Sequence, residues 1–249
     1  MDPKFELIKA FYAGLPKDRA KVETFDHGFA FLERILTDGM TLEYGERVLC
    51  RDVYKYKFSN VPPWKMEELL LSHVQKGCNV CLYFADKMNS LFGFNLDISQ
   101  KVNTTVISPE MALAVSTLRG ILTDVGCKPL VVGSGKGYHL WCRLAAAASN
   151  ERLYDFMLRV MAKTLYALHQ KGLDYNRINA RFYPDPRAQD KISLRLFGSD
   201  HPNNKVFSRL LTEDGLLDEE ASWNAFEEHL RVNTISETTF RNACESMTR

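Results

Sequence analysis

The chain has 249 residues, of which 45% are hydrophobic and 25% charged, a composition that excludes an intrinsically disordered protein and allows a sizeable core. Its formal net charge is +1, so any contact with a phosphate backbone must come from local clusters of lysine and arginine. An apolar signal segment and long uncharged apolar runs are both absent, which predicts a soluble intracellular protein without a membrane partner.

Apolar residues recur at helical spacing in six segments, several of which have a proline at the start and a glycine at the end. In chain order, these predicted helices lie at 29–36, 63–76, 109–125, 153–172, 219–230 and 237–247. Runs of β-forming residues predict strands at 79–84, 91–98, 130–132, 138–144, 192–197 and 206–211. Because helices lie both between and after strands, this order predicts an α+β fold, or an α/β fold with antiparallel pieces.

The first segment with chemical potential is the predicted strand at 91–98. Side chains alternate along a strand, so we expect Asn95 and Asp97 on one face. The other face then holds Phe94, Leu96 and Ile98. Two oxygen-bearing side chains at a strand end suit a hard cation such as Mg²⁺ or Mn²⁺. By themselves they also suit a turn or a solvated strand edge, which is the commoner use of such residues.

The second segment is a glycine-rich loop that leads into a strand, with the sequence Ser134-Gly135-Lys136-Gly137-Tyr138-His139-Leu140-Trp141. Gly135 and Gly137 allow the backbone to bend closely around a ligand and to point its N–H groups inward, and Lys136 adds a positive charge. With His139 two residues into the strand, such a loop could hold a nucleoside triphosphate, although its spacing is not that of a Walker loop. The alternative is a glycine hairpin with a packed histidine.

The third segment contains acids and arginines before another predicted strand. Asp185 stands in the run Arg181-Phe182-Tyr183-Pro184-Asp185-Pro186-Arg187, and Arg195 in the run Leu194-Arg195-Leu196-Phe197-Gly198-Ser199. Taken singly, a Pro-Asp-Pro sequence usually marks a turn. Its position after the two other segments gives it a second interpretation.

In order and content, the three segments resemble the three motifs of the archaeo-eukaryotic primase superfamily. That family has an acid–hydrophobic–acid strand end, a serine–glycine loop that leads to a histidine, and an aspartate before an arginine-containing strand. The resemblance covers residues 78–211, and its second motif is the most specific. It implies an α+β fold with a mixed-sheet primase-polymerase core, an RRM-like catalytic sheet and flanking helices. The implied divisions are an N-terminal α/β part at 1–77, the catalytic core at 78–211 and a helical extension at 212–249.

The resemblance also implies a chemistry and a set of residues. Such enzymes synthesise primers on single-stranded DNA from nucleoside triphosphates, with two Mg²⁺ or Mn²⁺ ions and with a helicase or a larger primase subunit as partner. By carry-over, the metal site comprises Asn95, Asp97 and Asp185, with Asp190 and Asp174 as alternatives to Asp185. The nucleotide site comprises Ser134, Gly135, Lys136, Gly137, His139 and Arg195.

One residue departs from the family pattern, because Asn95 stands where the family has an acid. An amide oxygen can still ligate a cation but brings no charge, and one unit charge at about 4 Å is worth roughly 4 kcal/mol at an effective dielectric near 20. The chain is therefore an impaired subunit that binds nucleotide or primer terminus, an active variant that recruits another acid, or a substituted form that traps substrate. A metal-dependent nuclease or phosphoesterase that uses Asp97, Asp185 and His139 is a further hypothesis.

Three other features have ordinary explanations. Cys78 and Cys81 have the spacing of zinc ligands, but zinc needs four ligands and no second such pair exists, so we expect scattered free thiols and no structural zinc. Lysines and arginines alternate with aromatic residues at 47–58, which suits either a nucleic-acid surface or a half-buried strand. His73 and His169 lie on or beside apolar helix faces, which indicates structural roles.

Overall fold

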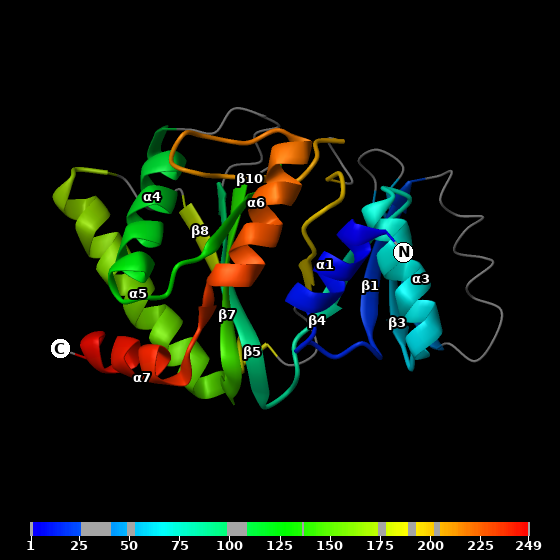
Figure 1. Ribbon diagram of the computed structural model, residues 1–249, viewed down its shortest axis with the longest axis horizontal. Helices are drawn as coiled ribbons and strands as arrows, with labels where there is room; N and C mark the ends of the chain where they lie inside the picture. The colour runs from blue at the N-terminus through cyan, green and yellow to red at the C-terminus, as the bar shows by residue number, and fades with distance from the viewer. Residues whose placement is uncertain are drawn as a thin grey trace. The chain divides into compact units, whose positions relative to one another are not determined.

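The computed structural model describes residues 2–25, 41–48, 53–98, 109–135, 137–173, 178–188, 193–201 and 205–248; the helix predicted at 29–36 lies outside them. The chain forms two compact units (Figure 1). Unit 1 comprises Met1–Ala85 and Asp190–Ser208, and unit 2 comprises Asp86–Gln189 and Arg209–Arg249. This division differs from the boundaries predicted after residues 77 and 211, because the chain leaves unit 1 after residue 85 and returns to it at residue 190.

The described residues of unit 1 form a five-stranded antiparallel sheet and two helices. Its strands are β1 (Ala20–Phe25), β2 (Thr41–Val48), β3 (Val53–Ser59), β4 (Asn79–Tyr83) and β9 (Ser193–Arg195), in the order β2-β3-β1-β4-β9. Its helices are α1 (Pro3–Phe11) and α3 (Pro63–Val74). Both helices begin at a proline, and the Asp2 side chain caps α1 by accepting a hydrogen bond from the Lys4 backbone nitrogen at 2.9 Å.

Alternation along these strands gives the sheet of unit 1 one apolar and one polar face. Val22 on β1 lies opposite Val80 on β4 and Tyr56 on β3, and all three are buried. Buried apolar residues also line α1 and α3, which supply the partner for this face. The intervening positions carry lysine, glutamate, cysteine and asparagine, so the opposite face is polar.

Unit 2 is a second antiparallel sheet, to which one short parallel strand is added. Its main strands are β5 (Met88–Ile98), β6 (Leu130–Gly133), β7 (Gly137–Ser149), β8 (Ile178–Tyr183) and β10 (Arg209–Leu210), in the order β10-β6-β7-β5-β8. The short strand β11 (Thr234–Ile235) pairs parallel to β7. The helices are α4 (Pro109–Asp124), α5 (Asn150–Gln170), α6 (Glu219–Val232) and α7 (Glu237–Ser246).

The core of unit 2 lies between the sheet and α4, α5 and α7, which gather on one side of it (Figure 1). Phe92, at the centre of β5, packs edge-on against Phe156 of α5 at 5.7 Å between ring centroids, and 5.8 Å from Phe240 of α7. Phe94 and Leu96 continue this buried row along β5. Because β5 alternates, the side chains between these residues point to the face that the core does not use.

The predicted α+β fold is confirmed, and most predicted helices and strands are present within a few residues of their expected ends. Strands β4 and β5 follow one another in the chain but belong to different sheets. Strands β1, β2 and β8 and helix α1 were not predicted, whereas β3 matches the half-buried strand that was one interpretation of residues 47–58. The described cysteines, at 78, 81, 127, 142 and 244, are free thiols. Within the described ranges, no helix combines the length and the apolar character needed to cross a bilayer.

Candidate active site

The first two motifs meet on the polar face of the sheet in unit 2. Strands β5 and β7 are antiparallel, and their register places Asn95 opposite His139 and Asp97 opposite Gly137. Phe94 and Leu96 point into the core on the other face. The predicted shared face of Asn95 and Asp97 is therefore confirmed by the register; the side chain of Ile98 is outside the described residues.

Asn95 and Asp97 contact each other directly. The Asn95 Nδ2 donates a hydrogen bond to Asp97 Oδ2 at 3.0 Å. The other end of the amide, Asn95 Oδ1, is buried and has no hydrogen-bond partner among the described residues. A buried amide oxygen without a partner, beside a carboxylate, matches the oxygen ligands that Mg²⁺ and Mn²⁺ prefer.

This pair is not a complete metal site by itself. Among the residues that the structure describes, no three or more histidine, cysteine, aspartate or glutamate side chains are grouped so that they could hold a metal ion. The described donors are thus one carboxylate and one amide oxygen. The residues present fit part of a divalent-cation site, and a further acid would have to come from outside the described ranges.

The glycine-rich segment is a tight hairpin between β6 and β7. The Ser134 backbone nitrogen donates to Gly137 O at 2.8 Å, and Gly135 has a φ of +86°, which favours glycine. A Cβ at Gly137 would lie 2.0 Å from Leu96 O and 2.8 Å from Asp97 Oδ1, so only glycine lets the hairpin approach the acid. A glycine hairpin was one of the two interpretations of this segment in the sequence analysis. In the structure, the hairpin brings the loop next to the Asn95–Asp97 pair. Lys136 lies outside the described residues.

His139 is held in a defined position on this face. It is 6% exposed, and its ring meets that of Trp141 edge-on, with 6.5 Å between centroids. Trp141 in turn lies over Gly93, where a Cβ would be 2.7 Å from the indole ring. His139 is therefore packed against Trp141, as a structural histidine would be. It is also adjacent to Asn95, as a histidine that binds nucleotide would be.

The sequence missed one row of residues that shares this face. Strand β8 lies on the other side of β5 and places Arg181 opposite Asn95, Asn179 opposite Asp97 and Tyr183 opposite Gly93. Burial raises the pKa of Tyr183, while Arg181 and the Asn95 amide partly oppose this shift. The available signal was the alternation of these three polar side chains with Ile178, Ala180 and Phe182.

The structure does not bring Asp185 together with Asn95 and Asp97. Strand β8 runs from Asn179, at the level of Asp97, to Tyr183, at the level of Gly93, which is about 13 Å along the strand. Asp185 follows still further on, and Arg187 forms two hydrogen bonds to it, Nε–Oδ1 and Nη2–Oδ2, each 3.0 Å long. These bonds lower the pKa of Asp185, so its carboxylate stays ionised and is paired with the Arg187 guanidinium. Asp174 and Asp190 lie outside the described residues.

Arg195 belongs to unit 1, where it lies on β9 opposite Cys81 of β4. It is therefore not part of the sheet that carries the other candidate residues.

Burial raises the pKa of Cys81 to about 11 and that of Cys78 to about 12, so both cysteines are ordinary buried thiols. His73 is structural as predicted, because its Nδ1 accepts from Val80 N at 3.1 Å and its Nε2 donates to Phe197 O at 2.9 Å.

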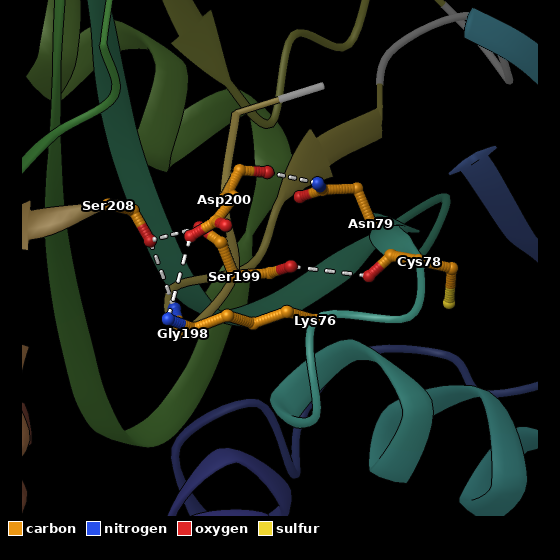
Figure 2. Close-up of polar contacts among 7 residues, drawn as sticks. All are labelled: Lys76, Cys78, Asn79, Gly198, Ser199, Asp200 and Ser208. Carbon is orange, nitrogen blue, oxygen red and sulfur yellow. Dashed lines mark hydrogen bonds and ion pairs between the residues drawn. The ribbon is translucent and has the colours of Figure 1, made fainter. Parts of the chain in front are cut away.

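The segment after Arg195 is fastened to the start of β4 by a polar network (Figure 2). Gly198 N donates to Ser208 Oγ at 3.1 Å, and Ser199 Oγ donates to Cys78 O at 3.3 Å. Asp200 forms an ion pair with Lys76 at 3.8 Å, and its backbone oxygen accepts from the Asn79 side chain. Ser199 thus has a structural role, and the network fixes the end of β9 within unit 1.

Comparison with solved structures shows similarity to a polymerase domain, whereas the comparisons of sequence give no match. No family model matches the chain, and no curated protein matches it. The polymerase domain of ligase D from Mycobacterium tuberculosis, solved in complex with DNA, is similar with a TM-score of 0.49 and 13% identity, over 98% of this chain and 87% of that one. The assignment of function to this chain therefore depends on the residues of the site.

Proposed function

We propose that this chain is a nucleotidyltransferase of the primase-polymerase kind, which joins nucleotides on a single-stranded DNA template. The observation that carries the proposal is the register of β5 and β7, in which Asn95 faces His139 and Asp97 faces Gly137. Two segments that resemble separate motifs of one enzyme family, and that lie about forty residues apart, are direct neighbours on one face. A chance resemblance in either segment gives no reason for this placement.

Each residue then has a separate role. Asp97 and Asn95 supply oxygen ligands for a divalent cation, which would activate the attacking hydroxyl and stabilise the leaving pyrophosphate when bound. Ser134 and His139, with Lys136 and the backbone of Gly135 and Gly137, hold the triphosphate. Arg181 lies on β8 opposite Asn95 and is a further candidate for a phosphate contact.

The third ligand of the cation, in addition to Asn95 and Asp97, is expected in the segment that precedes β8. The chain enters β8 at Ile178, which lies opposite Ile98, and therefore at the end of β5 that holds Asp97. Asp174 precedes that entry by four residues, whereas Asp185 and Asp190 follow the opposite end. We therefore propose Asp174 as the third ligand. Asp174→Ala should abolish Mn²⁺ binding measured by calorimetry, whereas Asp185→Ala should bind Mn²⁺ as the unaltered chain does.

The test of the function is a primer-synthesis assay with Asn95→Asp beside the unaltered chain. Restoring the second carboxylate adds charge where the cation binds, so synthesis from triphosphates should rise by about 100-fold or more. Asp97→Ala in the same assay should remove the activity of both forms. Equal, robust synthesis by both forms would mean that another acid already completes the site. Cleavage of single strands without triphosphates would indicate the nuclease hypothesis.

His139 is expected to bind triphosphate and not to act as the general base. It stands directly after the hairpin and beside Asn95, and a divalent cation held by Asp97 and Asn95 would itself acidify the attacking hydroxyl. His139→Ala should weaken triphosphate binding strongly in a fluorescence titration. Unchanged binding combined with a lower chemical rate would show that the histidine acts on the reaction instead.

A second function is favoured by the hydrogen bond between Asn95 and Asp97. The amide nitrogen takes up one oxygen of the only described carboxylate in the site, so a cation would have to compete for it. The chain would then bind a nucleotide or a primer terminus in a replication complex without efficient synthesis. Triphosphate binding by a chain that makes no product, with activity gained only on Asn95→Asp, is the result expected for this function.

A further inference from the structure

Tyr183 shares the polar face of the sheet in unit 2 with Asn95 and Asp97. The register of β5 and β8 places Tyr183 opposite Gly93, which lies two residues before Asn95 on the same face. Tyr183 and Asn95 are therefore diagonal neighbours on two adjacent strands, within reach of an aromatic side chain. The Tyr183 hydroxyl forms side-chain hydrogen bonds with both Asn95 and Arg181. This hydroxyl thus contacts the candidate cation site from β8.

The Asn95 atom that meets this hydroxyl is the amide nitrogen. Asn95 Oδ1 has no hydrogen-bond partner among the described residues, which leaves Nδ2 as the atom in contact with Tyr183. The sign of the effect agrees, because the Asn95 side chain lowers the pKa of Tyr183, as a donor to the phenol oxygen does. The same nitrogen donates to Asp97 Oδ2 at 3.0 Å. An amide nitrogen has two protons, so each proton of Asn95 Nδ2 has an acceptor.

These two acceptors fix the orientation of the Asn95 amide. Exchanging its two ends would place Oδ1 beside Asp97 Oδ2, where two acceptors that both carry negative charge repel each other. With Nδ2 bound to Asp97 and Tyr183, Oδ1 is directed away from both. Oxygen is also the end of an amide that ligates Mg²⁺ or Mn²⁺. The observed orientation therefore presents the end of Asn95 that a cation needs.

The ring of Tyr183 is held in place by packing. The residue is 3% exposed, and its ring lies 6.5 Å from that of Trp141 between centroids. Trp141 in turn lies directly over Gly93, the residue opposite Tyr183. The hydroxyl is therefore presented to Asn95 from a closely packed part of the sheet. Phenylalanine at this position would keep the ring and remove only the hydroxyl.

We propose that Tyr183 is a positioning residue, whose hydroxyl holds the Asn95 amide so that Oδ1 remains directed toward the cation. The inference rests on the proposed function, in which Asp97 ligates the same cation. A carboxylate that binds a cation accepts less strongly from Asn95, and the hydrogen bond to Tyr183 then keeps the amide from turning. An aspartate at position 95 would have an oxygen at both ends and would need no such restraint. The Tyr183 hydroxyl is thus required because residue 95 is an asparagine.

The first test is a double-mutant cycle of Mn²⁺ binding, measured by calorimetry. Tyr183→Phe should weaken binding by about tenfold in the unaltered chain, as loss of a hydrogen-bond partner behind a metal ligand does. The same change should leave binding unchanged in the Asn95→Asp chain, because a carboxylate cannot present the wrong end. An equal loss in both backgrounds would show that Tyr183 only supports the fold and would overturn the proposal, as would no loss in either.

The matched control is Tyr154→Phe, which removes the hydroxyl of another buried tyrosine in unit 2. Tyr154 lies on α5 and packs against Phe182 at 5.6 Å between centroids. Phe182 precedes Tyr183 on β8 and points to the opposite face of the sheet. Tyr154→Phe should leave Mn²⁺ affinity unchanged in both backgrounds, and melting curves confirm that each variant is folded. A loss as large as that in Tyr183→Phe would overturn the proposal.

The second test observes the Asn95 amide by heteronuclear NMR and needs no cation. The two side-chain amide protons of Asn95 are identified by their absence from the spectrum of Asn95→Asp. Tyr183→Phe should move one of the two resonances upfield and speed its exchange with water, because that proton loses its acceptor. Two unshifted resonances would overturn the proposal. A chain that shows the shift but binds no Mn²⁺ would keep Tyr183 as the partner of Asn95 and would overturn the metal site itself.

Discussion

At the scale of single residues, Gly137 shows how closely the two motifs are joined. The atom that a Cβ would meet is a backbone oxygen of β5, which cannot turn aside as a flexible side chain could. The hairpin and the acid-bearing strand are therefore in contact through a position that no other residue can occupy. Gly93, which lies beneath Trp141, is likewise a position that no other residue can occupy.

We predict that Gly137→Ala destabilises the chain by about 1–3 kcal/mol, as overpacking at a rigid contact does. It should also abolish triphosphate binding, because the hairpin must move away from Asp97. Gly120→Ala is the control, since nothing lies within 4 Å of its Cβ in helix α4. That change should stabilise the chain by about 0.5–1 kcal/mol. Urea unfolding of both variants measures the two changes in the free energy of unfolding. Equal changes would contradict a close contact between Gly137 and β5.

Asn95→Asp should have opposite effects on the free and the metal-loaded chain. In the free chain, the hydrogen bond to Asp97 becomes a contact between two carboxylates, so the melting temperature should fall by several degrees. With Mn²⁺ present the two charges share a cation, and the variant should melt above the unaltered chain under the same conditions. A variant that Mn²⁺ does not stabilise would exclude this pair from any metal site.

His73 makes the stability of unit 1 depend on pH. Burial lowers its pKa from 6.5 to about 4, so the unfolded chain binds the proton more readily than the folded one. The contribution of neutral His73 to the free energy of unfolding is therefore fully present above pH 6.5. It is lost as the pH is lowered to 4, and the loss is at most about 3 kcal/mol. Unfolding measured between pH 7 and 4 checks this. His229 of unit 2 has a similarly lowered pKa, so the measurement uses His229→Gln to leave His73 as the source. A flat profile in that variant would contradict the assignment.

At the scale of elements, the sequence predicted those with strong periodicity and clear ends. Helix α3 begins at its prolines, and α4 ends before Gly126, which has a φ of +79°. No strand was predicted at β8, because Arg181 and Asn179 point to the polar face of its sheet, where they resemble loop residues. For β3, the alternation of lysine with aromatic residues was noted, and the sheet places Tyr56 and Phe58 in the apolar face and Lys57 on the opposite, polar face.

The candidate site was predictable only where residues are close in the sequence. The spacing of Asn95 and Asp97 fixes their shared face, and the hairpin of residues 134–137 places His139 next to it. Asp185 was misplaced because its position depends on the direction in which β8 runs beside β5, and no local pattern contains that direction. Arg195 was grouped with the nucleotide residues by order along the chain, although it returns to the sheet of unit 1.

At the scale of the whole molecule, unit 1 is built from two separate stretches of chain. Strand β4 pairs with β9 so that Tyr83 lies opposite Ser193, and the chain between them forms part of unit 2. Tyr83 and Ser193 are therefore placed as the two ends of a hairpin would be. The segment after β9 also supplies Phe197, whose carbonyl accepts from His73 and whose amide donates to the Tyr12 hydroxyl at 3.2 Å.

We predict that residues 1–85, joined to residues 190–208 by a short hairpin linker, fold as an independent protein. Residues 1–85 alone should not, because His73 and Tyr12 lose their partners and β4 loses a neighbour. Dispersed amide resonances and a cooperative melt of the joined form, absent from the shorter one, are the expected result. A shorter form that melts as cooperatively would mean that β9 adds nothing to unit 1.

Because unit 1 is built from two separate stretches of chain, it cannot complete its fold during translation until the second stretch has been made. Strand β4 leaves the exit tunnel long before its neighbour β9, because most of unit 2 is translated between them. At roughly 5–20 residues per second, the edge of β4 waits for on the order of ten seconds without a partner. An unpaired strand edge of this kind is a template for wrong pairing with other chains. The N-terminal unit, although made first, is thus completed late, and the nascent chain needs protection for as long as that edge is open.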